Sequence, residues 1–464
     1  MKSFYREEEK ILSVPDELKT GELEELELVD CLILESVLLE ILEINSKLSI
    51  LNLVTIYFDE ESFEKESPIE EIPGFLFGFP NIKHLDLGEN AIKSIPPEIN
   101  MLHELKSLLV EKNQLDHLSF PIILPSGLEY LDISGNKIGE LPKSVYSLFK
   151  LKTLHCRHLK LKIFELEQGD LVNLENLDFS YSNIQLIGSG LAGLGSLRVL
   201  NLNTCELKTF PEGVFEMDSL EEINLQNCQV ISDHINTLMN SYKLKKLNLN
   251  KIKFESLSLS RLDNLEHLIL KECNLKSLEI EKNSLQNLRY IDLDNNELAA
   301  LPNSFYQLKS LESIVLNNNK INGISSGIGE LIKLRSLRLF KNKMTYLPEN
   351  FGDLDQLESL NLGQNALREI PGLEKLKKLK WIDISGCREL EDIDDILDRL
   401  SFLPNLSTIS LQWLDVKKLP DRFKYSNSLK RINIGRTSLM DKERIDFQNK
   451  FPNVYLWMIS QRNN

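Results

Sequence analysis

The sequence lacks the features of membrane and secreted proteins. Its 464 residues contain no run of about 20 apolar residues, the length that a membrane-spanning helix needs. The first ten residues, MKSFYREEEK, lack the basic and then apolar pattern of a signal peptide. These absences predict a cytoplasmic protein without a membrane partner.

Motifs of enzymes are also missing. The sequence has no GxxxxGK phosphate loop, no GxSxG nucleophile turn and no HExxH metal-binding helix. It carries no appended kinase, ligase or nuclease segment. Since catalysis needs a site and none is visible, we expect a protein that is not an enzyme and has no catalytic residue, cofactor or metal.

Two short patterns are similar to functional motifs. Residues 188–193, GSGLAG, match GxGxxG, but they lie between two repeats rather than after the buried strand of a dinucleotide-binding fold. Residues 155–158, HCRH, contain metal-ligand types. Strand alternation points Cys156 inward and His155 outward, so these side chains cannot converge on one zinc ion. We expect structural glycines and surface histidines.

What the sequence has instead is a repeated unit, seen in residues 288–310, LRYIDLDNNELAALPNSFYQLKS. Ile291 and Leu293 point to one side of a short strand, and Tyr290 and Asp292 point to the other. Asn296 turns the chain, and its amide can pair the backbone of the loop. Such a unit cannot bury its own apolar face, so it must stack on like units.

The unit recurs along the chain, most often every 23 residues. Frames of the form LxxLxL begin at residues 23, 48, 82, 105, 128, 151, 174, 197, 220, 244, 265, 288, 311, 334, 357, 379, 406, 429 and 451. This pattern resembles leucine-rich repeat proteins of the cytoplasmic type, whose unit reads LxxLxLxxNxLxxLPxxhxxLxxL. The resemblance implies an α/β solenoid, a right-handed horseshoe with a parallel β-sheet on its concave face. It also implies short 3-10, helical or extended segments on the convex face.

The expected organisation has three parts. Residues 1–22 form an N-terminal cap, residues 23–439 form a solenoid of about 18 repeats, and residues 440–464 form a C-terminal cap with a final strand. Irregular repeats are expected near 37–81, 151–165, 244–260 and 387–405. The acidic segment 59–71 should be a solvated loop, and helices are expected near 390–400 and 441–449.

The turn position of the repeat does not always carry asparagine. Five of the six cysteines occupy it, namely Cys31, Cys205, Cys228, Cys273 and Cys387, and we expect them to be structural and free of disulfides. Leu159 and Ile252 occupy it in two other repeats. Because apolar side chains cannot pair the loop amides, we expect the backbone to turn differently there, with altered curvature.

Charge is unevenly distributed. Residues 1–71 hold 20 acidic and 6 basic side chains, whereas residues 401–464 hold 5 acidic and 11 basic ones. The simple explanation is that the ends of a solenoid are polar. The functional one is that the two ends select different partners, or favour weak head-to-tail self-association.

The candidate partner-binding residues are aromatic and basic side chains expected at outward strand positions of the concave face. Exposed aromatics and arginines are the typical composition of interface hot spots. The main set is Tyr290, Arg338, Phe340, Lys341, Trp381, Trp413, Arg431, Arg436, Tyr455 and Trp457, and a secondary set is His155, Arg157, His158, Tyr181 and His267. The alternative is that Trp413 and Trp457 only cover the end of the solenoid.

These residues predict a non-enzymatic scaffold that holds a partner protein on the concave face, and the partner should be acidic where it meets the C-terminal half. The resemblance leaves a second hypothesis open, a regulatory subunit that inhibits or activates an enzyme such as a small GTPase or phosphatase. Nucleic-acid binding through the basic C-terminal end is a weaker alternative, because the sequence pI is only about 5.1.

Overall fold

The computed structural model describes residues 2–58, 68–209, 214, 217–228, 243–260, 262–425 and 428–458. The chain divides into two units, an N-terminal unit, Met1–His234, and a C-terminal unit, Ile235–Asn464. In the described part of the chain, no helix has the length and apolar character needed to cross a membrane. Each unit is described separately below.

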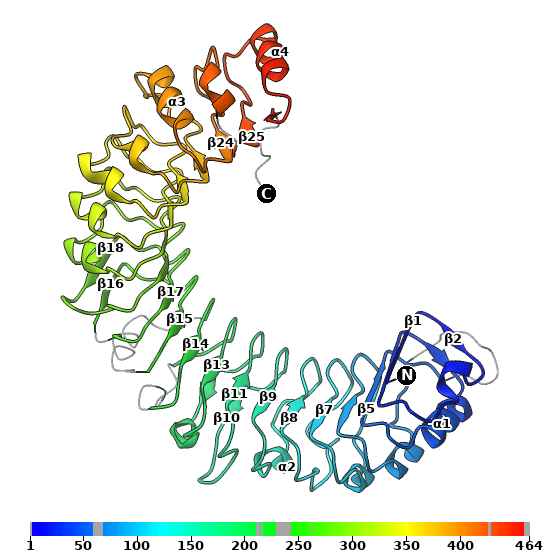
Figure 1. The fold of residues 1–464 in the computed structure, drawn as a ribbon. Helices are drawn as coiled ribbons and strands as arrows, with labels where there is room; N and C mark the ends of the chain where they lie inside the picture. The colour runs from blue at the N-terminus through cyan, green and yellow to red at the C-terminus, as the bar shows by residue number, and fades with distance from the viewer. Residues whose placement is uncertain are drawn as a thin grey trace. The chain divides into compact units, whose positions relative to one another are not determined.

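The N-terminal unit is a parallel sheet built from one strand per repeat (Figure 1). Its strands pair in chain order: β1 (Ser3–Glu7), β3 (Glu25–Val29), β5 (Ile50–Val54), β6 (His84–Asp86), β7 (Ser107–Leu109), β8 (Tyr130–Asp132), β9 (Thr153–His155), β11 (Asn176–Asp178), β13 (Val199–Asn201) and β14 (Glu222–Asn224). Residues 1–22, assigned to a cap from sequence, therefore contain β1, a strand of this same sheet.

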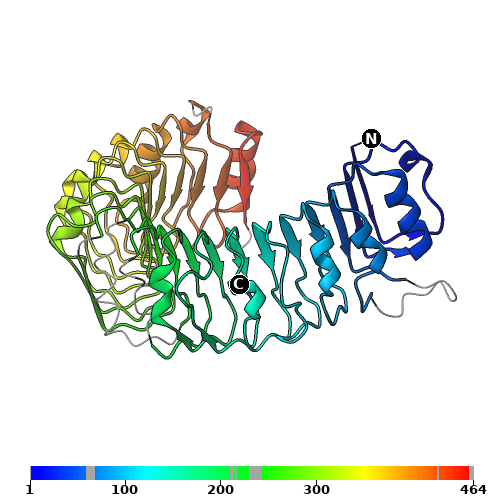
Figure 2. The same cartoon turned by 90° about the horizontal axis from the view of Figure 1, so that it is seen from below.

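The other side of the N-terminal unit carries short segments of varied type (Figures 1 and 2). The helices are α1 (Glu35–Ile44) and α2 (Lys143–Tyr146), and the 3-10 turns are η1 (Asp16–Leu18), η2 (Gly74–Gly78), η3 (Pro97–Met101) and η4 (Ser189–Gly193). Two small strand pairs complete it, β2 (Lys10–Ile11) with β4 (Leu32–Ile33) and β10 (Ile163–Phe164) with β12 (Leu186–Ile187). This mixture of short helices and extended pieces confirms the expected architecture.

The C-terminal unit repeats the arrangement. Its strands pair in chain order: β15 (Lys246–Asn248), β17 (His267–Ile269), β19 (Tyr290–Asp292), β20 (Ser313–Val315), β21 (Ser336–Arg338), β22 (Ser359–Asn361), β23 (Trp381–Asp383), β24 (Thr408–Ser410), β25 (Arg431–Asn433) and β26 (Tyr455–Trp457). A second strand pair joins β16 (Ser256–Leu259) to β18 (Ser277–Ile280).

The remaining segments of the C-terminal unit are α3 (Ile393–Ser401), α4 (Asp441–Lys450), η7 (Asn303–Gln307), η8 (Ser326–Glu330), η9 (Glu349–Asp353), η10 (Leu373–Lys375) and η11 (Asp421–Tyr425). Both predicted helices are confirmed. Asp392 caps α3 by accepting the backbone N–H of Asp395 at 2.9 Å, and the helix buries Ile396, Leu397 and Leu400 against the repeats.

The core consists of the inward leucines and isoleucines, such as Leu288, Ile291 and Leu293, which are fully buried. At the turn, Asn296 donates its amide to the carbonyl oxygens of Leu270 and Leu293 and accepts from the N–H of Leu275. Each turn asparagine thus joins two neighbouring repeats through buried hydrogen bonds. Losing such bonds would leave backbone groups unpaired in the core.

Cysteines at the turn position make one of the same hydrogen bonds between repeats. The thiols of Cys205, Cys228, Cys273 and Cys387 each donate to a carbonyl oxygen of the preceding repeat, at 2.9 to 3.2 Å. All six cysteines are buried and none is in a disulfide, as expected from sequence. Burial raises the pKa of Cys205, Cys273 and Cys387 to about 12, so these thiols stay protonated and able to donate.

The prediction that the chain turns differently at Leu159 and Ile252 is wrong. The residues before them, His158 and Lys251, have φ of 54° and 64°, close to the 55° of Asn295 in a regular repeat. The turn keeps its shape because backbone hydrogen bonds to the next repeat hold it, from His158 N to Ser180 O at 3.0 Å and from Lys251 N to Lys271 O at 2.9 Å. The side chain at the turn position adds hydrogen bonds without setting the backbone path.

The prediction that the acidic segment 59–71 is a solvated loop can be tested only at residues 68–71, and it is wrong at Ile69. Residues 59–67 lie outside the described part of the chain. Ile69 is buried, and its N–H donates to the carbonyl of Ile56 at 2.8 Å, so the end of this segment packs on the repeats instead of remaining solvated.

Candidate protein-binding faces

Each repeat presents the same outward positions, which together form what we call the strand face. In the three-residue strands of the main sheets, such as β8, β9 and β25, the central residue is buried and its two neighbours occupy the outward positions. The register aligns these neighbours into columns, so that Tyr290, Ser313 and Ser336 are successive partners, as are Asp292, Val315 and Arg338. A third outward position follows each strand, and after it comes the residue with positive φ that begins the turn.

Recurrent aspartates and asparagines in the second column serve the fold. In Asp86, Asp132, Asp178 and Asp292, one carboxylate oxygen accepts the backbone N–H two residues further on, at 2.8 to 2.9 Å. Asn201, Asn361 and Asn433 make the same bond. The bond needs only an acceptor oxygen, so it explains the consensus residue without giving it a role in binding.

The structure places the ten main candidates in two rows. Tyr290, Arg338, Trp381, Arg431, Tyr455 and Trp457 lie in strands, as expected. Phe340, Lys341, Trp413 and Arg436 follow the strands, and the last three begin turns with φ of 56°, 67° and 58°. Their assignment to strand positions is therefore wrong, since the strands of the structure are only three residues long there and end at Arg338, Ser410 and Asn433. We call these four residues, which follow the strands, the turn row.

A serine-floored stretch lies between two aromatic side chains of the C-terminal unit. From Tyr290 to Trp381 the first outward column carries Ser313, Ser336 and Ser359 on successive paired strands. Arg338 is exposed in the adjacent column. The serines were not among the candidates, although a run of short polar side chains at one repeat position is a signal that the sequence offers.

Phe340 lies beside this stretch, half-buried. Its backbone N–H donates to the side-chain oxygen of Asn317 at 2.9 Å. A Cβ on Gly363 would lie only 3.0 Å from the Phe340 ring, so the glycine leaves room for the ring against the next repeat. Phe340 thus presents one ring surface outward on a fixed support.

Trp413 is held between two arginines. The guanidinium of Arg436 lies 4.1 Å from the centre of its ring, and that of Arg388 lies 5.6 Å away. The indole is still 37% exposed. Cation–π contacts of this kind contribute about 0.5–1 kcal/mol at exposed sites. Arg388 was missed from sequence because its spacing to Trp413 spans the longer repeat that holds α3.

The secondary candidates form two clusters in the N-terminal unit and one pair in the C-terminal unit. His158 stacks on Tyr181, with ring centres 4.8 Å apart and planes 7° from parallel. The imidazole of His155 forms a hydrogen bond with the Tyr130 hydroxyl at 3.0 Å and lies 3.3 Å from the Asp132 carboxylate. Arg157 donates to the same carboxylate at 2.8 Å. His267 lies next to Tyr290 on the neighbouring strand, with ring centres 5.9 Å apart.

The pKa values of Asp132 and Glu111 in the N-terminal unit are shifted in opposite directions. Burial alone would raise the pKa of Asp132, but hydrogen bonds from His155 and Ser134 and the Arg157 charge outweigh it, and the pKa is lowered. Burial, with a further contribution from Asp86, raises the pKa of Glu111 to about 7. One carboxylate oxygen of Glu111 is buried and has no hydrogen-bond partner.

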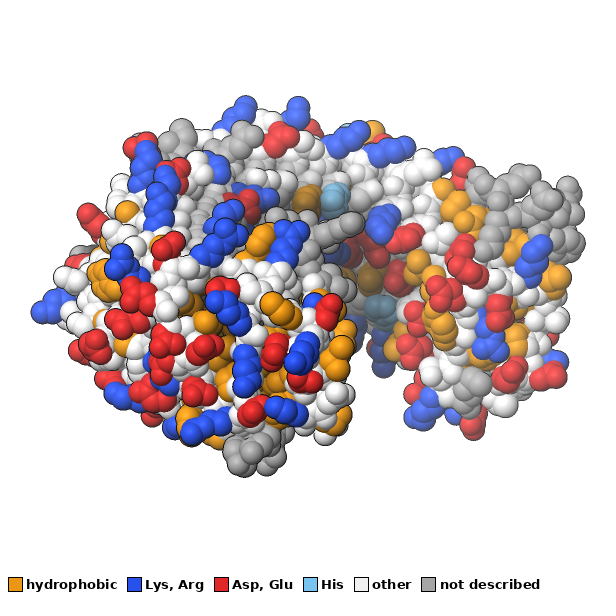
Figure 3. Space-filling model, turned by 90° about the horizontal axis from the view of Figure 1, so that it is seen from above, with side chains coloured by type: hydrophobic (Ala, Val, Ile, Leu, Met, Phe, Trp, Pro, Cys, Tyr) orange, Lys and Arg blue, Asp and Glu red, His pale blue; other side chains and the backbone are white. Residues whose placement is uncertain are grey.

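The strand face of the N-terminal unit is also hollowed. A pocket of about 290 Å³ is lined by Tyr130, Thr153, His155, Asn176, Leu177, Asp178, Val199, Leu200, Asn201, Glu222 and Asn224. Over the surface in view in Figure 3, basic and acidic side chains are interspersed.

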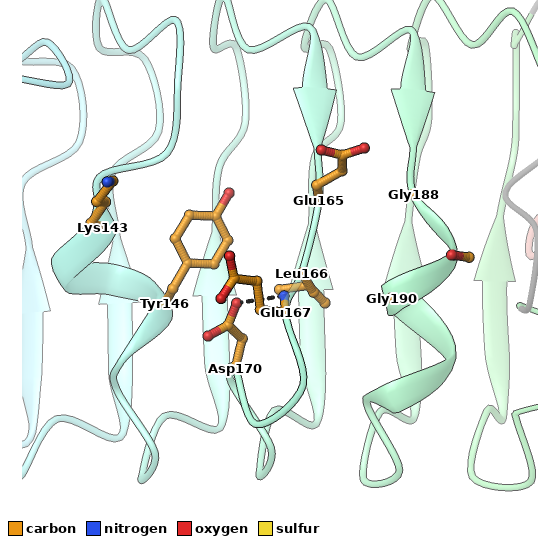
Figure 4. Close-up of a pocket in the computed structure, with 9 residues that line it drawn as sticks. Lys143, Tyr146, Glu165, Leu166, Glu167, Asp170, Gly188 and Gly190 are labelled. Atoms are coloured by element: carbon orange, nitrogen blue, oxygen red, sulfur yellow. Dashed lines mark hydrogen bonds between the residues drawn. The ribbon is translucent and has the colours of Figure 1, made fainter.

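The GxGxxG pattern lies in a different pocket, away from the strand face. This pocket of about 520 Å³ is lined by Lys143, Tyr146, Glu165, Leu166, Glu167, Asp170, Gly188, Ser189 and Gly190 (Figure 4). A Cβ on Gly190 would collide with the carbonyl oxygen of Leu166, so the glycine allows close stacking of two repeats. The pattern opens a five-residue 3-10 turn, which is a packing role and not a dinucleotide cradle.

Among the described residues, no group of three or more His, Cys, Asp or Glu side chains is arranged to hold a metal ion. In particular, Cys156 is fully buried while His155 faces the strand face. The HCRH sequence therefore does not assemble into a metal site.

Comparisons with known proteins agree with this geometry. Residues 258–460 match the family described as Leucine-rich repeat region, and residues 127–148 match the Leucine Rich Repeat family. Curated proteins give no match. Similar solved structures include a leucine-rich repeat protein of Leptospira interrogans, 23% identical with a TM-score of 0.73, covering 84% of this chain and 99% of that one.

Two further similar structures are complexes. The plant peptide hormone receptor RGFR1 in complex with RGF2 is 20% identical with a TM-score of 0.58, covering 99% of this chain and 80% of that one. The Drosophila Toll–Spatzle complex is 17% identical with a TM-score of 0.65, covering 94% of this chain and 64% of that one. At these identities the similarity establishes the fold alone. Together with the family matches over residues 258–460 and 127–148 and the observed sheet of one strand per repeat, it shows that the chain has the leucine-rich repeat fold.

Proposed function

We propose that the protein is a non-enzymatic, cytoplasmic scaffold that binds a partner protein through the strand face and turn row of its C-terminal unit. The observation that carries this proposal is the serine-floored stretch between Tyr290 and Trp381, with Arg338 exposed beside it. Small floor residues leave space for partner side chains, and the bounding aromatic groups offer rigid apolar area.

The charge of this face selects the partner. Arg338, Lys341, Arg431 and Arg436 are all exposed on it, and Arg388 adds a further cation at Trp413. A partner with an acidic surface would satisfy these cations, and attraction over a distance would speed its approach. The two similar complexes, with RGF2 and with Spatzle, support only the general class of protein or peptide binding.

The test compares affinity capture from native cell lysate by the wild type and by the triple variant Arg338→Glu, Phe340→Ala and Trp381→Ala. A partner retained by the wild type should bind the variant at least 30-fold more weakly, since loss of one interface hot spot alone costs about 2 kcal/mol or more. Titration of the purified partner would measure the affinity, and its decrease with salt would report an acidic contact.

A matched control carries the same types of change elsewhere in the C-terminal unit, at Arg368→Glu, Phe402→Ala and Tyr346→Ala. Phe402 and Tyr346 are exposed, and Arg368 is exposed beside Glu391. The control should bind the partner as the wild type does. Equal capture by the wild type and the strand-face variant would show that this face is not the binding site.

A further inference from the structure

The first and last strands of the chain are edge strands. Within the described part of its unit, β1 pairs with β3, and β26 pairs with β25. A strand inside a parallel ladder bonds a neighbour on each side, whereas an edge strand leaves the N–H and C=O groups of one side open. We call these two open sides the N-edge, at β1, and the C-edge, at β26. Each is a sheet edge that one more strand could extend.

The C-edge exposes apolar side chains. Leu456 holds the inward position of β26 and is only partly buried, whereas Ile432 at the same position of β25 is fully buried. Four other apolar residues of this last repeat are more than half exposed, namely Met440, Ile445, Tyr455 and Met458. The last repeat thus lacks the cover that a further repeat would give it.

The N-edge is guarded by an inward arginine. Arg6 lies opposite Leu28 of β3, at a position that points toward the core. Its guanidinium lies 4.2 Å from the centre of the Phe4 ring and 3.2 Å from a carboxylate oxygen of Glu9. Inward charge protects a sheet edge from indiscriminate pairing. A strand that pairs with β1 must therefore place an uncharged or acidic side chain beside Arg6.

The two edges carry opposite charge. Residues 1–30 hold 10 acidic and 4 basic side chains, whereas residues 429–458 hold 3 acidic and 6 basic ones. On the strands next to the edges, Glu25 and Glu27 take the outward positions of β3, and Lys430 and Arg431 are exposed at β25. Attraction therefore favours contact between an N-edge and a C-edge, and repulsion opposes contact between two edges of the same kind.

The register of the ladder determines which residues would meet. Ser3 aligns with Glu25, and Tyr455 aligns with Arg431, each one residue before the central buried position. A β1 strand added to β26 in this register places Ser3 beside Tyr455. The short serine side chain leaves room for the exposed tyrosine ring.

The next positions are also compatible. Tyr5, which is exposed, would lie beside Trp457, and cross-strand aromatic pairs stabilise a sheet. Met458, three residues after Tyr455, would lie beside Arg6, three residues after Ser3. Its thioether is uncharged and flexible, which is what the guarded N-edge requires.

We propose that the C-edge of one molecule binds the N-edge of a second copy of this chain, with β1 of the second copy extending the sheet of β26 as a parallel strand. The contact joins two different surfaces, so each bound pair still has one free edge of each kind. Oligomers larger than a dimer are therefore expected, and their proportion rises with concentration. The proposal concerns the chain alone and does not depend on the proposed binding of an acidic partner.

The test is sedimentation of the purified full-length protein over a wide range of concentration at low salt. Two variants place lysine on one edge each, because lysine on an edge strand opposes pairing. The N-edge variant is Ser3→Lys with Tyr5→Lys, and the C-edge variant is Tyr455→Lys with Met458→Lys, which sets a cation beside Arg6. All four positions are exposed, and circular dichroism checks the fold. Each variant alone should associate at least tenfold more weakly than the wild type.

The decisive sample is an equimolar mixture of the two variants. The N-edge variant keeps an intact C-edge, and the C-edge variant keeps an intact N-edge, so the mixture should form a one-to-one dimer and no larger species. Added salt should weaken this dimer, because opposite charges attract across the contact. A mixture that stays monomeric would overturn the proposal. Association of the N-edge variant at the wild-type strength would also overturn it, by showing that two C-edges meet.

A matched control carries lysine at exposed apolar positions away from both edges, one in each unit, as Ile122→Lys with Tyr346→Lys. The control should associate within twofold of the wild type. Equal loss in the control and in the edge variants would show that exposed apolar surface in general, and not the sheet edges, causes association. A wild type that remains monomeric at every concentration would exclude the contact altogether.

Discussion

The strand faces of the two units are supported by the same kinds of turn residue, but their outward side chains differ. In the N-terminal unit the outward columns between Tyr130 and Glu222 hold Thr153, Asn176 and Val199 in the first, and Asp132, His155, Asp178 and Asn201 in the second. In the C-terminal unit the corresponding columns from Tyr290 to Trp381 hold three serines in the first, and Asp292, Val315, Arg338, Asn361 and Asp383 in the second. The inward leucines are nearly the same in both. The repeat therefore separates folding from recognition, because outward positions can change charge without disturbing the buried ones.

The largest effect on stability is expected at Asp132, which is 2% exposed and holds Arg157 at 2.8 Å. In Asp132→Asn, the side-chain oxygen can still accept from Ser134, but an amide donor then faces the guanidinium. We expect the free energy of unfolding to fall by about 2 kcal/mol at pH 7, because the buried carboxylate oxygen that accepts from Arg157 and contacts His155 is replaced by an amide donor. Urea unfolding would measure this loss.

The pH dependence of that loss has a defined sign. Because the pKa of folded Asp132 is below its ordinary value, its stabilising contribution is present above about pH 4 and disappears as the pH falls through the folded pKa. The difference between the variant and the wild type should therefore shrink in acid. Asp178→Asn, in the same column, is the control and should change stability by less than about 0.5 kcal/mol. An equal loss at both positions would exclude Arg157 as the cause.

A smaller effect of opposite sign is expected at Glu111. Its pKa in the folded protein is about 7, above the ordinary 4.5, chiefly because of burial. The folded state then holds more protons than the unfolded state between these values, so the wild type loses stability as the pH rises from about 4.5 to 7. Glu111→Gln should stabilise the protein by about 1 kcal/mol above pH 7, a value discounted for partial exposure.

Urea unfolding of Glu111→Gln at pH 5 and pH 8 would test this prediction, with a clear gain expected only at pH 8. Glu89→Gln is the control, because Glu89 is paired with Lys112 and its loss should give no gain. A stabilisation of the Glu111 variant that is the same at both pH values would show that packing, not ionisation, is responsible.

The sequence was sufficient to predict the repeats, because strand, turn and inward positions recur in register and each requires a specific residue type. Asn296 and Cys387 illustrate this, since both donate to the preceding repeat as their position implied. It was not sufficient at Leu159, where the backbone bond from His158 to Ser180 keeps the turn regular despite the apolar side chain.

The candidate faces were less predictable than the fold. The contact of Trp413 with Arg388 and Arg436 joins residues from three repeats of unequal length, so single-repeat spacing could not reveal it. The hollow at Thr153, Asn176 and Val199 depends on which side chains are small in one column of adjacent strands. Such a hollow forms where the outward side chains of neighbouring strands are small, and a search of the sequence for aromatic and charged residues does not detect it.

The smallest predicted effect is at Asp292, the position of the C-terminal unit that corresponds to Asp132. Asp292 accepts from the Asp294 N–H at 2.9 Å and has no described arginine contact within 4 Å. Burial, with a contribution from Asp294, raises its pKa.

The ionised form of Asp292 is therefore slightly disfavoured at pH 7, and Asp292→Asn should stabilise the protein by no more than about 0.5 kcal/mol, with the gain lost below about pH 4. Urea unfolding in parallel with Asp132→Asn makes the comparison direct, since both changes preserve the acceptor of the turn. A loss at Asp292 as large as that at Asp132 would mean that the second column stabilises both units through its charge. Opposite signs would show that the neighbouring arginine, and not the shared turn, decides what each carboxylate contributes.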